Sequence, residues 1–239
     1  MNKELEKRIN DCADAEKAKI LQRFFKTGGG EYGEGDVFLG LVVPKLRILA
    51  KEFSNLNINE IQELLDNKIH EKRMIGLFIL IKHYEKATRE NNDKLKMEIF
   101  EFYLKNASKN NINNWDLVDL SAPNIVGKYL IDKDREILYK LARSSNLWEK
   151  RIAILATFAL IREGEFADCL EISEILLPDT HDLIHKAVGW MLREVGKRNE
   201  GELKSFLKRH YKNMPRTMLR YSIEKFPENV RKKYLKGEI

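Results

Sequence analysis

Apolar residues recur along most of the chain at the three- and four-residue spacing of an α-helix. The spacing is clear in the stretch that contains Met74, Leu77, Phe78, Ile81 and Tyr84. No segment competes seriously as a strand, so the pattern predicts an all-α fold. Capping residues and helix breakers place the helices at 1–26, 45–53, 58–66, 70–87, 92–108, 115–130, 134–144, 148–163, 166–176, 180–197, 200–212 and 215–235.

Short connections between these helices favour antiparallel packing of consecutive helices. A long run of such helix pairs is typical of an α-solenoid, although the pairs are too dissimilar in sequence to establish a repeat. No linker or low-complexity tract interrupts the chain. We therefore expect a single domain over residues 1–239.

The charge balance is mildly basic, with 43 Lys and Arg residues against 37 Asp and Glu residues and a formal net charge of +6. Only basic residues gathered on one face would indicate a polyanionic partner. The longest uncharged apolar stretch, 152–161, is about half the roughly 20 residues that a membrane-spanning helix needs. The first residues are charged and lack the pattern of an export signal. We expect a cytoplasmic protein that does not bind membranes.

Cysteine and histidine spacing gives no sign of a metal site. Cys12 and Cys169 are far apart, without the spacing of a zinc site or a disulfide framework. His181 and His185 have the i, i+4 spacing of helical metal ligands, but no third ligand is evident. We expect reduced thiols and no metal or organic cofactor.

The segment 113–123 opens a predicted helix with Asn114 as a plausible N-cap. Trp115 and Asp119 are four residues apart, about 40° around the helix axis, so an indole and a carboxylate share one face. Asp116 lies in the first turn, where it suits the helix dipole. The alternative is that Trp115 belongs to the core and Asp119 is a solvated surface acid.

Two further helices carry candidate residues. Residues 148–163 are apolar on nearly every side, except for Arg151 in the first turn, which needs a carboxylate, a carbonyl or a phosphate as its partner. An intramolecular salt bridge is the commonest of these. In the helix at 180–197 a polar stripe recurs at i, i+4, i+7 and i+11 and suits a phosphate backbone with a nucleoside face, or a cation resting on a half-buried indole. The stripe consists of Lys186, Trp190, Arg193 and Lys197.

A glycine-rich loop at 28–44 ends in a helix start at Pro44. The loop lacks the Gly-Lys-Ser/Thr ending of a nucleotide triphosphate site. Backbone amides at this helix start, together with Lys45 and Arg47, could instead take one DNA phosphate.

Four motifs in this order resemble those of the AlkD-like alkylpurine DNA glycosylases. They are Phe-Leu-Gly-x-x-x-Pro-x-x-Arg at 38–47, Trp-Asp-x-Val-Asp at 115–119, the segment 148–155 with Arg151, and Lys-Ala-x-Gly-Trp-x-Leu-Arg-Glu at 186–194. Each motif alone is unspecific, but together they span nearly the whole chain.

The resemblance implies an all-α, HEAT-like repeat α-solenoid of superhelical helix pairs with a concave basic groove for duplex DNA. It implies hydrolysis of the N-glycosidic bond of purines made cationic by N3 or N7 alkylation. Trp115 and Trp190 would contact the deoxyribose, Asp119 would face the anomeric carbon and Arg151 would hold the DNA backbone. The groove tyrosine of the family corresponds to Phe24, which lacks the hydroxyl.

The expected activity is therefore that of a monofunctional glycosylase, acting as a monomer on double-stranded DNA that contains alkylated purines. Lys186 and Arg193 are expected to bind phosphates along with Arg151. The alternative is a non-catalytic HEAT-like scaffold that binds nucleic acid or protein through the same groove.

Overall fold

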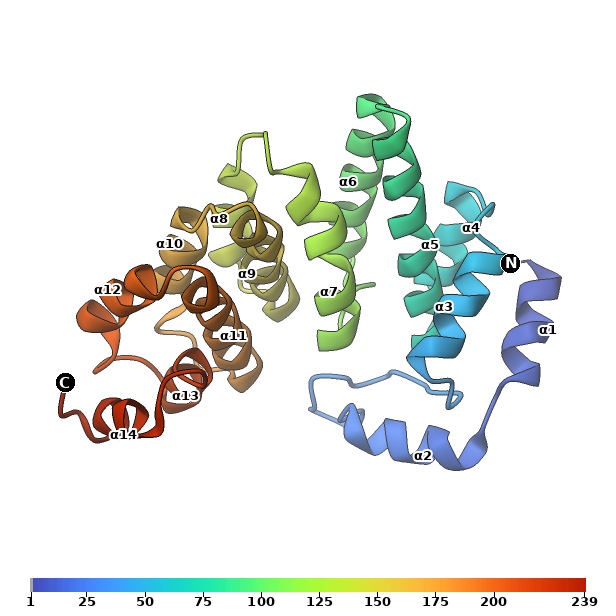
Figure 1. The fold of residues 1–239 in the computed structure, drawn as a ribbon. Helices are drawn as coiled ribbons and strands as arrows, with labels where there is room; N and C mark the ends of the chain where they lie inside the picture. Colours follow the sequence, from blue (N-terminus) through green and yellow to red (C-terminus); the bar gives the residue numbers. More distant parts are fainter. Residues whose placement is uncertain (1) are drawn as a thin grey trace. The chain divides into compact units, whose positions relative to one another are not determined.

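The computed structural model describes residues 2–239 and contains helices but no strand in that range. Val37 and Ile69 form an isolated parallel β-bridge. The predicted all-α fold is confirmed. The chain forms two compact units, unit 1 up to Ser121 and unit 2 from Ala122 to Ile239 (Figure 1). The single domain and the concave groove stay predictions.

Unit 1 is built around α5, which packs against α3, α4, α6 and α7 (Figure 1). Every residue from 70 to 80 in α5 is buried, including the polar residues of its first turn. The helices of unit 1 are α1 (Lys3–Asp11), α2 (Ala15–Phe24), α3 (Val43–Glu52), α4 (Ile58–Leu65), α5 (His70–Arg89), α6 (Asp93–Ser108) and α7 (Trp115–Ser121).

Unit 2 is built around α9, which is buried on nearly every side, as predicted, and packs against η1, α8, α10 and α11. Consecutive helices pack together from α4 to α6 in unit 1 and from α8 to α12 in unit 2, as expected for helix pairs of an α-solenoid, and α11 also packs against α13. The helices of unit 2 are η1 (Pro123–Gly127), α8 (Glu136–Ala142), α9 (Leu147–Arg162), α10 (Ala167–Leu176), α11 (Asp182–Arg198), α12 (Glu200–His210), α13 (Arg216–Ser222) and α14 (Glu228–Lys236).

The predicted terminal helices 1–26 and 215–235 are each two helices. In the first, Asp14 caps α2 by accepting a hydrogen bond from the Lys17 amide, and its own amide donates to the Leu39 carbonyl. In the second, Pro227 stands at the N-cap of α14 and keeps the residue before it out of helical geometry. Local capping and proline sterics therefore overrode a continuous helical pattern.

The predicted helix 115–130 was also wrong, because α7 ends at Ser121 and the π-helical turn η1 follows. Pro123 has no amide hydrogen to continue the α-helical pattern. The Gly127 amide instead donates to the Ala122 carbonyl five residues earlier, at 2.9 Å. The turn therefore lies directly after the helix that carries Trp115 and Asp119. Such π-helical turns are frequent at functional sites.

Close packing of α11 on α13 depends on Gly189. A β-carbon at this position would lie 2.5 Å from Tyr221 Cβ and 2.6 Å from the Met218 carbonyl oxygen. The Met218 carbonyl oxygen belongs to the backbone, so it cannot rotate away from the added carbon. Gly189 thus sets the distance between the helix that carries Trp190 and its neighbour.

Gly189→Ala should lower the free energy of unfolding by about 1–3 kcal/mol, because overpacking outweighs the roughly 1 kcal/mol gained in helix propensity. Urea denaturation measures this change. Gly201→Ala in the exposed first turn of α12 is the matched control, because the only neighbour of its added Cβ is the Asn199 side chain. Equal stability of the two variants would contradict the packing argument.

Candidate functional site

Trp115, the first residue of α7, is half-buried at the outer end of a stack of four rings. Its ring stacks on Phe25, with centroids 5.3 Å apart and an interplanar angle of 14°. Phe25 stacks on Phe38 at 4.9 Å, and Phe38 stacks on the His70 imidazole at 4.5 Å. The His70 ring also lies 5.1 Å from Phe25, tilted by 36°, so these three rings contact one another behind the indole. The indole orientation is therefore set by rings from three other segments of unit 1.

The inner end of the stack, His70, lies between two buried carboxylates. Its Nδ1 is 3.1 Å from an Asp36 carboxylate oxygen, and its Nε2 is 2.9 Å from Asp116 Oδ2. The Arg73 guanidinium pairs with the other oxygen of Asp36 at 2.6 Å. Asp116 lies in the first turn of α7, as predicted, but its carboxylate serves His70 as well as the helix start. We call Asp36, His70, Arg73 and Asp116 the buried ion cluster.

The cluster favours charged side chains. Burial alone would lower the pKa of His70, but the charge of Asp116 and the hydrogen bonds to Asp116 and Asp36 raise it above the ordinary 6.5. Burial alone would raise the pKa of Asp36, but the hydrogen bond from His70 and the charge of Arg73 lower it. Two positive and two negative groups then balance inside unit 1.

Phe24, expected from the family resemblance to line the groove, lies beside Trp115. It is the last residue of α2, and 61% of its surface is exposed. Its ring meets the indole edge-on, with centroids 6.1 Å apart and an angle of 73°. Two accessible aromatic side chains, one on α2 and one on α7, therefore adjoin each other in unit 1.

Asp119 is half-buried one helical turn after Trp115, which agrees with a shared helix face. Its neighbour across unit 1 is Tyr103, a fully buried residue whose hydroxyl is 2.8 Å from Ser121 Oγ. Burial raises the pKa of Tyr103, and the negative charge of Asp119 raises it further. The Asp119 carboxylate is thus held near a buried phenol that stays protonated.

The loop before α3 uses its amides internally. Glu71 Oε1 accepts hydrogen bonds from the amides of Leu39, Gly40 and Leu41 at 2.9, 2.8 and 3.2 Å. Gly40 adopts a φ of 89°, which a larger residue would strain to reach. A protein carboxylate therefore occupies the place that a phosphate would need at these three loop amides.

Lys45 and Arg47 project from the start of α3 and are exposed. The Arg47 guanidinium lies 4.3 Å from the centre of the Phe78 ring. It lines a cavity of about 400 Å³ together with Lys51 and Lys82. Three cations on one side of unit 1 are compatible with the predicted phosphate contact at Arg47.

In unit 2, Arg151 is buried at the first turn of α9, with 4% of its surface exposed. One guanidinium nitrogen donates to the Leu183 carbonyl at the start of α11. The sequence indicated a carboxylate, a carbonyl or a phosphate as the partner of Arg151. In the fold, a backbone carbonyl is one such partner.

Trp190 on α11 is half-buried, with its ring centroid 6.0 Å from that of Phe158. Its Nε1 donates to Glu194 Oε1 at 3.3 Å, one turn further along the helix. Burial alone would raise the pKa of Glu194, but the hydrogen bond and charge of Lys197 lower it. An ionised carboxylate thus holds the indole by its edge.

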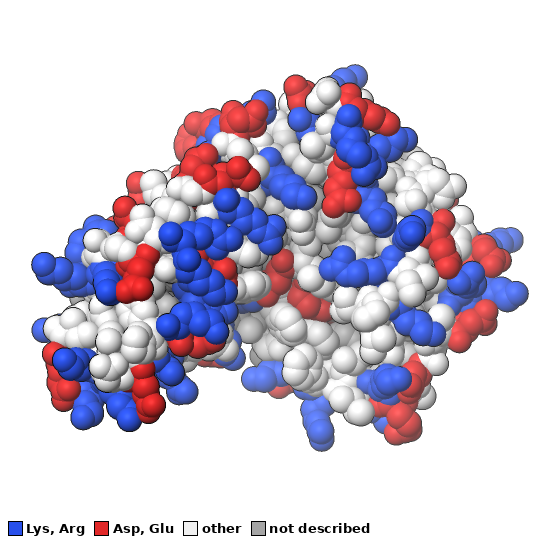
Figure 2. All heavy atoms as spheres, in the orientation of Figure 1, with Lys and Arg blue, Asp and Glu red and all other residues white. Residues whose placement is uncertain are grey.

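The cations of the predicted stripe are all in ion pairs. Lys186 pairs with Asp182 at 2.6 Å, Lys197 pairs with Glu194 at 2.6 Å, and Arg193 pairs with Glu224. Figure 2 shows Lys and Arg side chains gathered over α9 and α11 with acidic side chains beside them. The stripe is therefore less positive than its sequence suggests.

Sequence reasoning missed the buried ion cluster. Its signal was the run of four polar residues, His70 to Arg73, at the start of an otherwise apolar helix. All four are buried, with 1–4% of their surface exposed. Such residues need partners from elsewhere in the fold, and Asp36 and Asp116 are too distant in sequence to be recognised as those partners.

Across residues 2–239, no cluster of three or more His, Cys, Asp or Glu side chains is arranged to hold a metal ion. Within the same range, every helix is too short or too polar to cross a membrane. Both cysteines are free thiols, as expected, and burial raises the pKa of Cys169 to about 12.

Residues 5–226 match the sequence family described as DNA alkylation repair enzyme. A solved structure, described as a predicted DNA alkylation repair enzyme from Enterococcus faecalis, matches with a TM-score of 0.64. The two sequences are 15% identical, and the match covers 90% of this chain and 97% of that chain. At this identity the likeness shows the fold alone. No curated protein matches the sequence.

The raised pKa of His70 predicts a pH-dependent stability of unit 1. The stabilisation from charged His70 is fully present below the ordinary pKa of 6.5 and is lost as the pH rises through the raised pKa. His70→Gln should therefore cost most at pH 6, about 3–5 kcal/mol for a broken buried pair, and the difference from wild type should shrink in alkaline solution.

Urea unfolding from pH 6 to 9 measures this difference. His83→Gln is the control, because His83 does not belong to the buried ion cluster. Its Nε2 forms a hydrogen bond with the Ser54 carbonyl instead. A His70 imidazole that titrates below 6.5 by NMR, or a pH-independent difference from wild type, would contradict the charge assignment.

Proposed function

Since the chain belongs to the family of DNA alkylation repair enzymes, we propose that it is a monofunctional DNA glycosylase for cationic N3- or N7-alkylated purines in duplex DNA. The observation that carries the proposal is that Trp115 and Asp119 lie one helical turn apart on α7. Both are half-buried, and a four-ring stack orients the indole. The exposed Phe24 adds a second aromatic surface beside them.

The proposed reaction needs stabilisation of the sugar more than protonation of the base. Alkylation gives the purine a positive charge, so the base leaves neutral when the bond to C1′ breaks and its electron pair moves to the ring nitrogen. Positive charge then builds on the deoxyribose, as in other glycoside hydrolyses. Water adds to C1′ and releases one proton, which leaves an abasic site.

Asp119 is the group proposed to stabilise this charge and to orient the attacking water. A preorganised charge or dipole of this kind contributes about 10²–10³ in rate. The faces of Trp115 and, from unit 2, Trp190 are proposed to contact the deoxyribose, since indole faces attract positive charge. Preorganisation is supported by the ring stack behind Trp115 and by the Glu194 hydrogen bond to Trp190.

Phosphate binding is proposed for Lys186 and Arg193 on α11, Arg151 on α9, and Lys45 and Arg47 on α3. The Lys186–Asp182 pair is about half exposed, so it is worth roughly 0–1 kcal/mol and a DNA phosphate can replace the carboxylate. Arg151 has five donors, but because it is buried it needs a local opening to reach a phosphate. It is proposed to hold the backbone near the lesion.

Asp119→Asn should reduce the release of 7-methylguanine or 3-methyladenine from methylated duplex DNA by about 10²–10³, because it removes the charge that opposes the cationic sugar. Chromatography of released bases measures the rate. Glu101→Gln, which removes an exposed negative charge from α6 in the same unit, is the control and should behave as wild type.

Equal base release by wild type and Asp119→Asn would remove Asp119 from the mechanism. A wild type that binds DNA but releases no base would instead favour the non-catalytic scaffold.

Lys186→Ala and Arg193→Ala should each flatten the plot of log K against log salt concentration by about 0.9 for every phosphate that the variant no longer neutralises. Fluorescence anisotropy with duplex DNA measures the slope. Lys140→Ala is the matched control, because Lys140, like Lys186, pairs with an acid four residues earlier on a helix of unit 2. Slopes equal to that of wild type would count against this DNA interface.

A further inference from the structure

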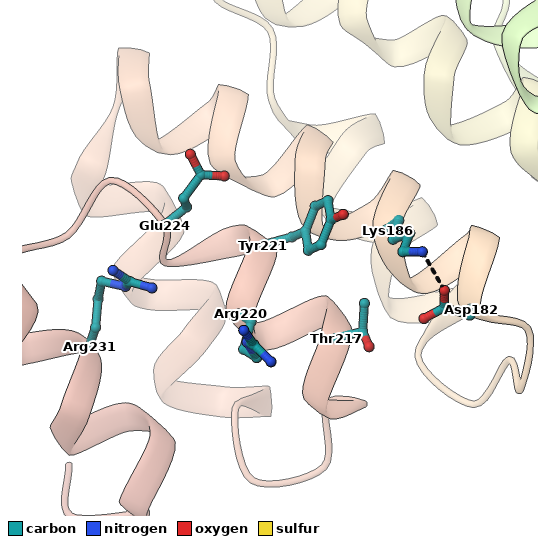
Figure 3. A pocket seen from close by; sticks show the side chains of 7 residues that line it. All are labelled: Asp182, Lys186, Thr217, Arg220, Tyr221, Glu224 and Arg231. Atoms are coloured by element: carbon teal, nitrogen blue, oxygen red, sulfur yellow. Dashed lines mark ion pairs between the residues drawn. The ribbon is translucent and has the colours of Figure 1, made fainter. Parts of the chain in front are cut away.

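A cavity of about 430 Å³ opens in unit 2 between α11, α13 and α14 (Figure 3). Its size lies in the range of small-molecule sites, roughly 300–1,000 Å³, and exceeds the needs of a single phosphate ion. Of its lining residues, only Lys186 is proposed above to contact DNA. The cavity walls are therefore available for a role that the catalytic proposal does not use.

The two acids of the cavity are already neutralised. Asp182 pairs with Lys186 at 2.6 Å, and Glu224 pairs with Arg193 and, at 3.2 Å, with Lys225. Burial alone would raise the pKa of Asp182, but its bond with Lys186 lowers it. The lowered pKa of Glu224 is caused chiefly by the hydrogen bond from Lys225. Both carboxylates are therefore ionised and held by cations.

Two arginines on the other walls have no such partner. Within residues 2–239, neither Arg220 nor Arg231 forms a side-chain hydrogen bond or an ion pair. The Nε of Arg231 is buried and has no hydrogen-bond partner. Figure 3 shows the Arg231 guanidinium extending from α14 in the direction of Arg220 on α13. A buried donor without a partner is costly, so an oxyanion in the cavity would relieve it.

The ligand that suits these groups carries a phosphate. Guanidinium groups bind phosphate oxygens through two parallel hydrogen bonds. The Thr217 hydroxyl, which also lines the cavity, donates a hydrogen bond to Asp182 and so leaves the phosphate to the two arginines. The Tyr221 ring, with its hydroxyl directed toward α11 in Figure 3, supplies a flat surface for the attached sugar or base. The contact between Gly189 and Tyr221 Cβ fixes this wall against α11.

We propose that the cavity is a nucleotide-phosphate subsite, in which Arg220 and Arg231 bind a phosphate of the DNA strand and Tyr221 packs against the adjoining sugar. A free mononucleotide offers the same chemistry, but the position of the cavity favours the strand. Lys186 lies one helical turn before Trp190, and Glu224 binds Arg193, so the cavity continues the row of phosphate-binding residues on α11. This choice of source rests on the proposed function.

The first test compares Arg220→Gln, Arg231→Gln and the double variant with wild type on undamaged duplex DNA. The double variant leaves this one phosphate without a partner and should reduce the salt slope of binding by about 0.9, and each single variant should reduce it by less. Lys233→Gln is the control, because it removes the same charge from an exposed position of α14 outside the cavity. Unchanged melting temperatures would show that the variants fold.

The second test titrates wild type and the double variant with adenosine monophosphate and with inorganic phosphate by calorimetry. Reduced salt slopes support the strand phosphate. Suppose instead that the salt slopes equal that of Lys233→Gln, and that wild type binds the mononucleotide while the double variant does not. This result would overturn the assignment to a strand phosphate in favour of a free nucleotide. Unchanged slopes with no mononucleotide binding would overturn the subsite itself.

Neither test uses base release. A wild type without glycosylase activity would contradict the proposed function. The salt slopes and the calorimetric titrations would still show whether the cavity binds a phosphate.

Discussion

The buried ion cluster is the interaction on which the candidate site in unit 1 depends. Asp36 comes from the loop after α2, His70 and Arg73 come from α5, and Asp116 comes from α7. Burying one of these charges alone would cost several kcal/mol, so the cluster is stable only when all the segments are in place. The seven-residue helix that carries Trp115 is thereby tied to the central helix of its unit.

The same imidazole that completes the cluster also ends the ring stack. The rings of His70, Phe38 and Phe25 contact one another at centroid distances of 4.5, 4.9 and 5.1 Å, and Phe25 stacks on Trp115 at 5.3 Å. A change at His70 can therefore reach the indole through Phe25. For a reaction that depends on fixed charges and ring faces around a cationic sugar, this rigidity is useful because the groups need no reorganisation.

In unit 2, a buried carboxylate on α11 holds the Trp190 indole. Glu194 holds Trp190 by its indole nitrogen and is held in turn by Lys197. Lys186 and Arg193 on the same helix pair with Asp182 and Glu224, and the Lys186–Asp182 pair is about half exposed. Arg220 and Arg231, which come from helices outside the family motifs, line the cavity and form no ion pair within residues 2–239. The charge proposed to bind DNA thus differs from the charge counted along one helix.

The sequence predicted what is local or periodic. The apolar spacing along α5 and α9, and the shared face of Trp115 and Asp119, follow from the geometry of one helix. The break at Pro123 was visible as a proline, but its π-helical form depends on the Ala122–Gly127 hydrogen bond in the folded chain. The partners of His70, at Asp36 and Asp116, are set by tertiary packing, and no periodicity reveals them.

Glycosylase activity on cationic purines can be tested in a single experiment. Wild-type protein in excess is incubated with duplex DNA that carries a single 7-methylguanine, and both the free base and the abasic site are quantified. We expect equal amounts of the two products, formed much faster than in DNA alone. Bound DNA from which the base leaves no faster than it does spontaneously would contradict it.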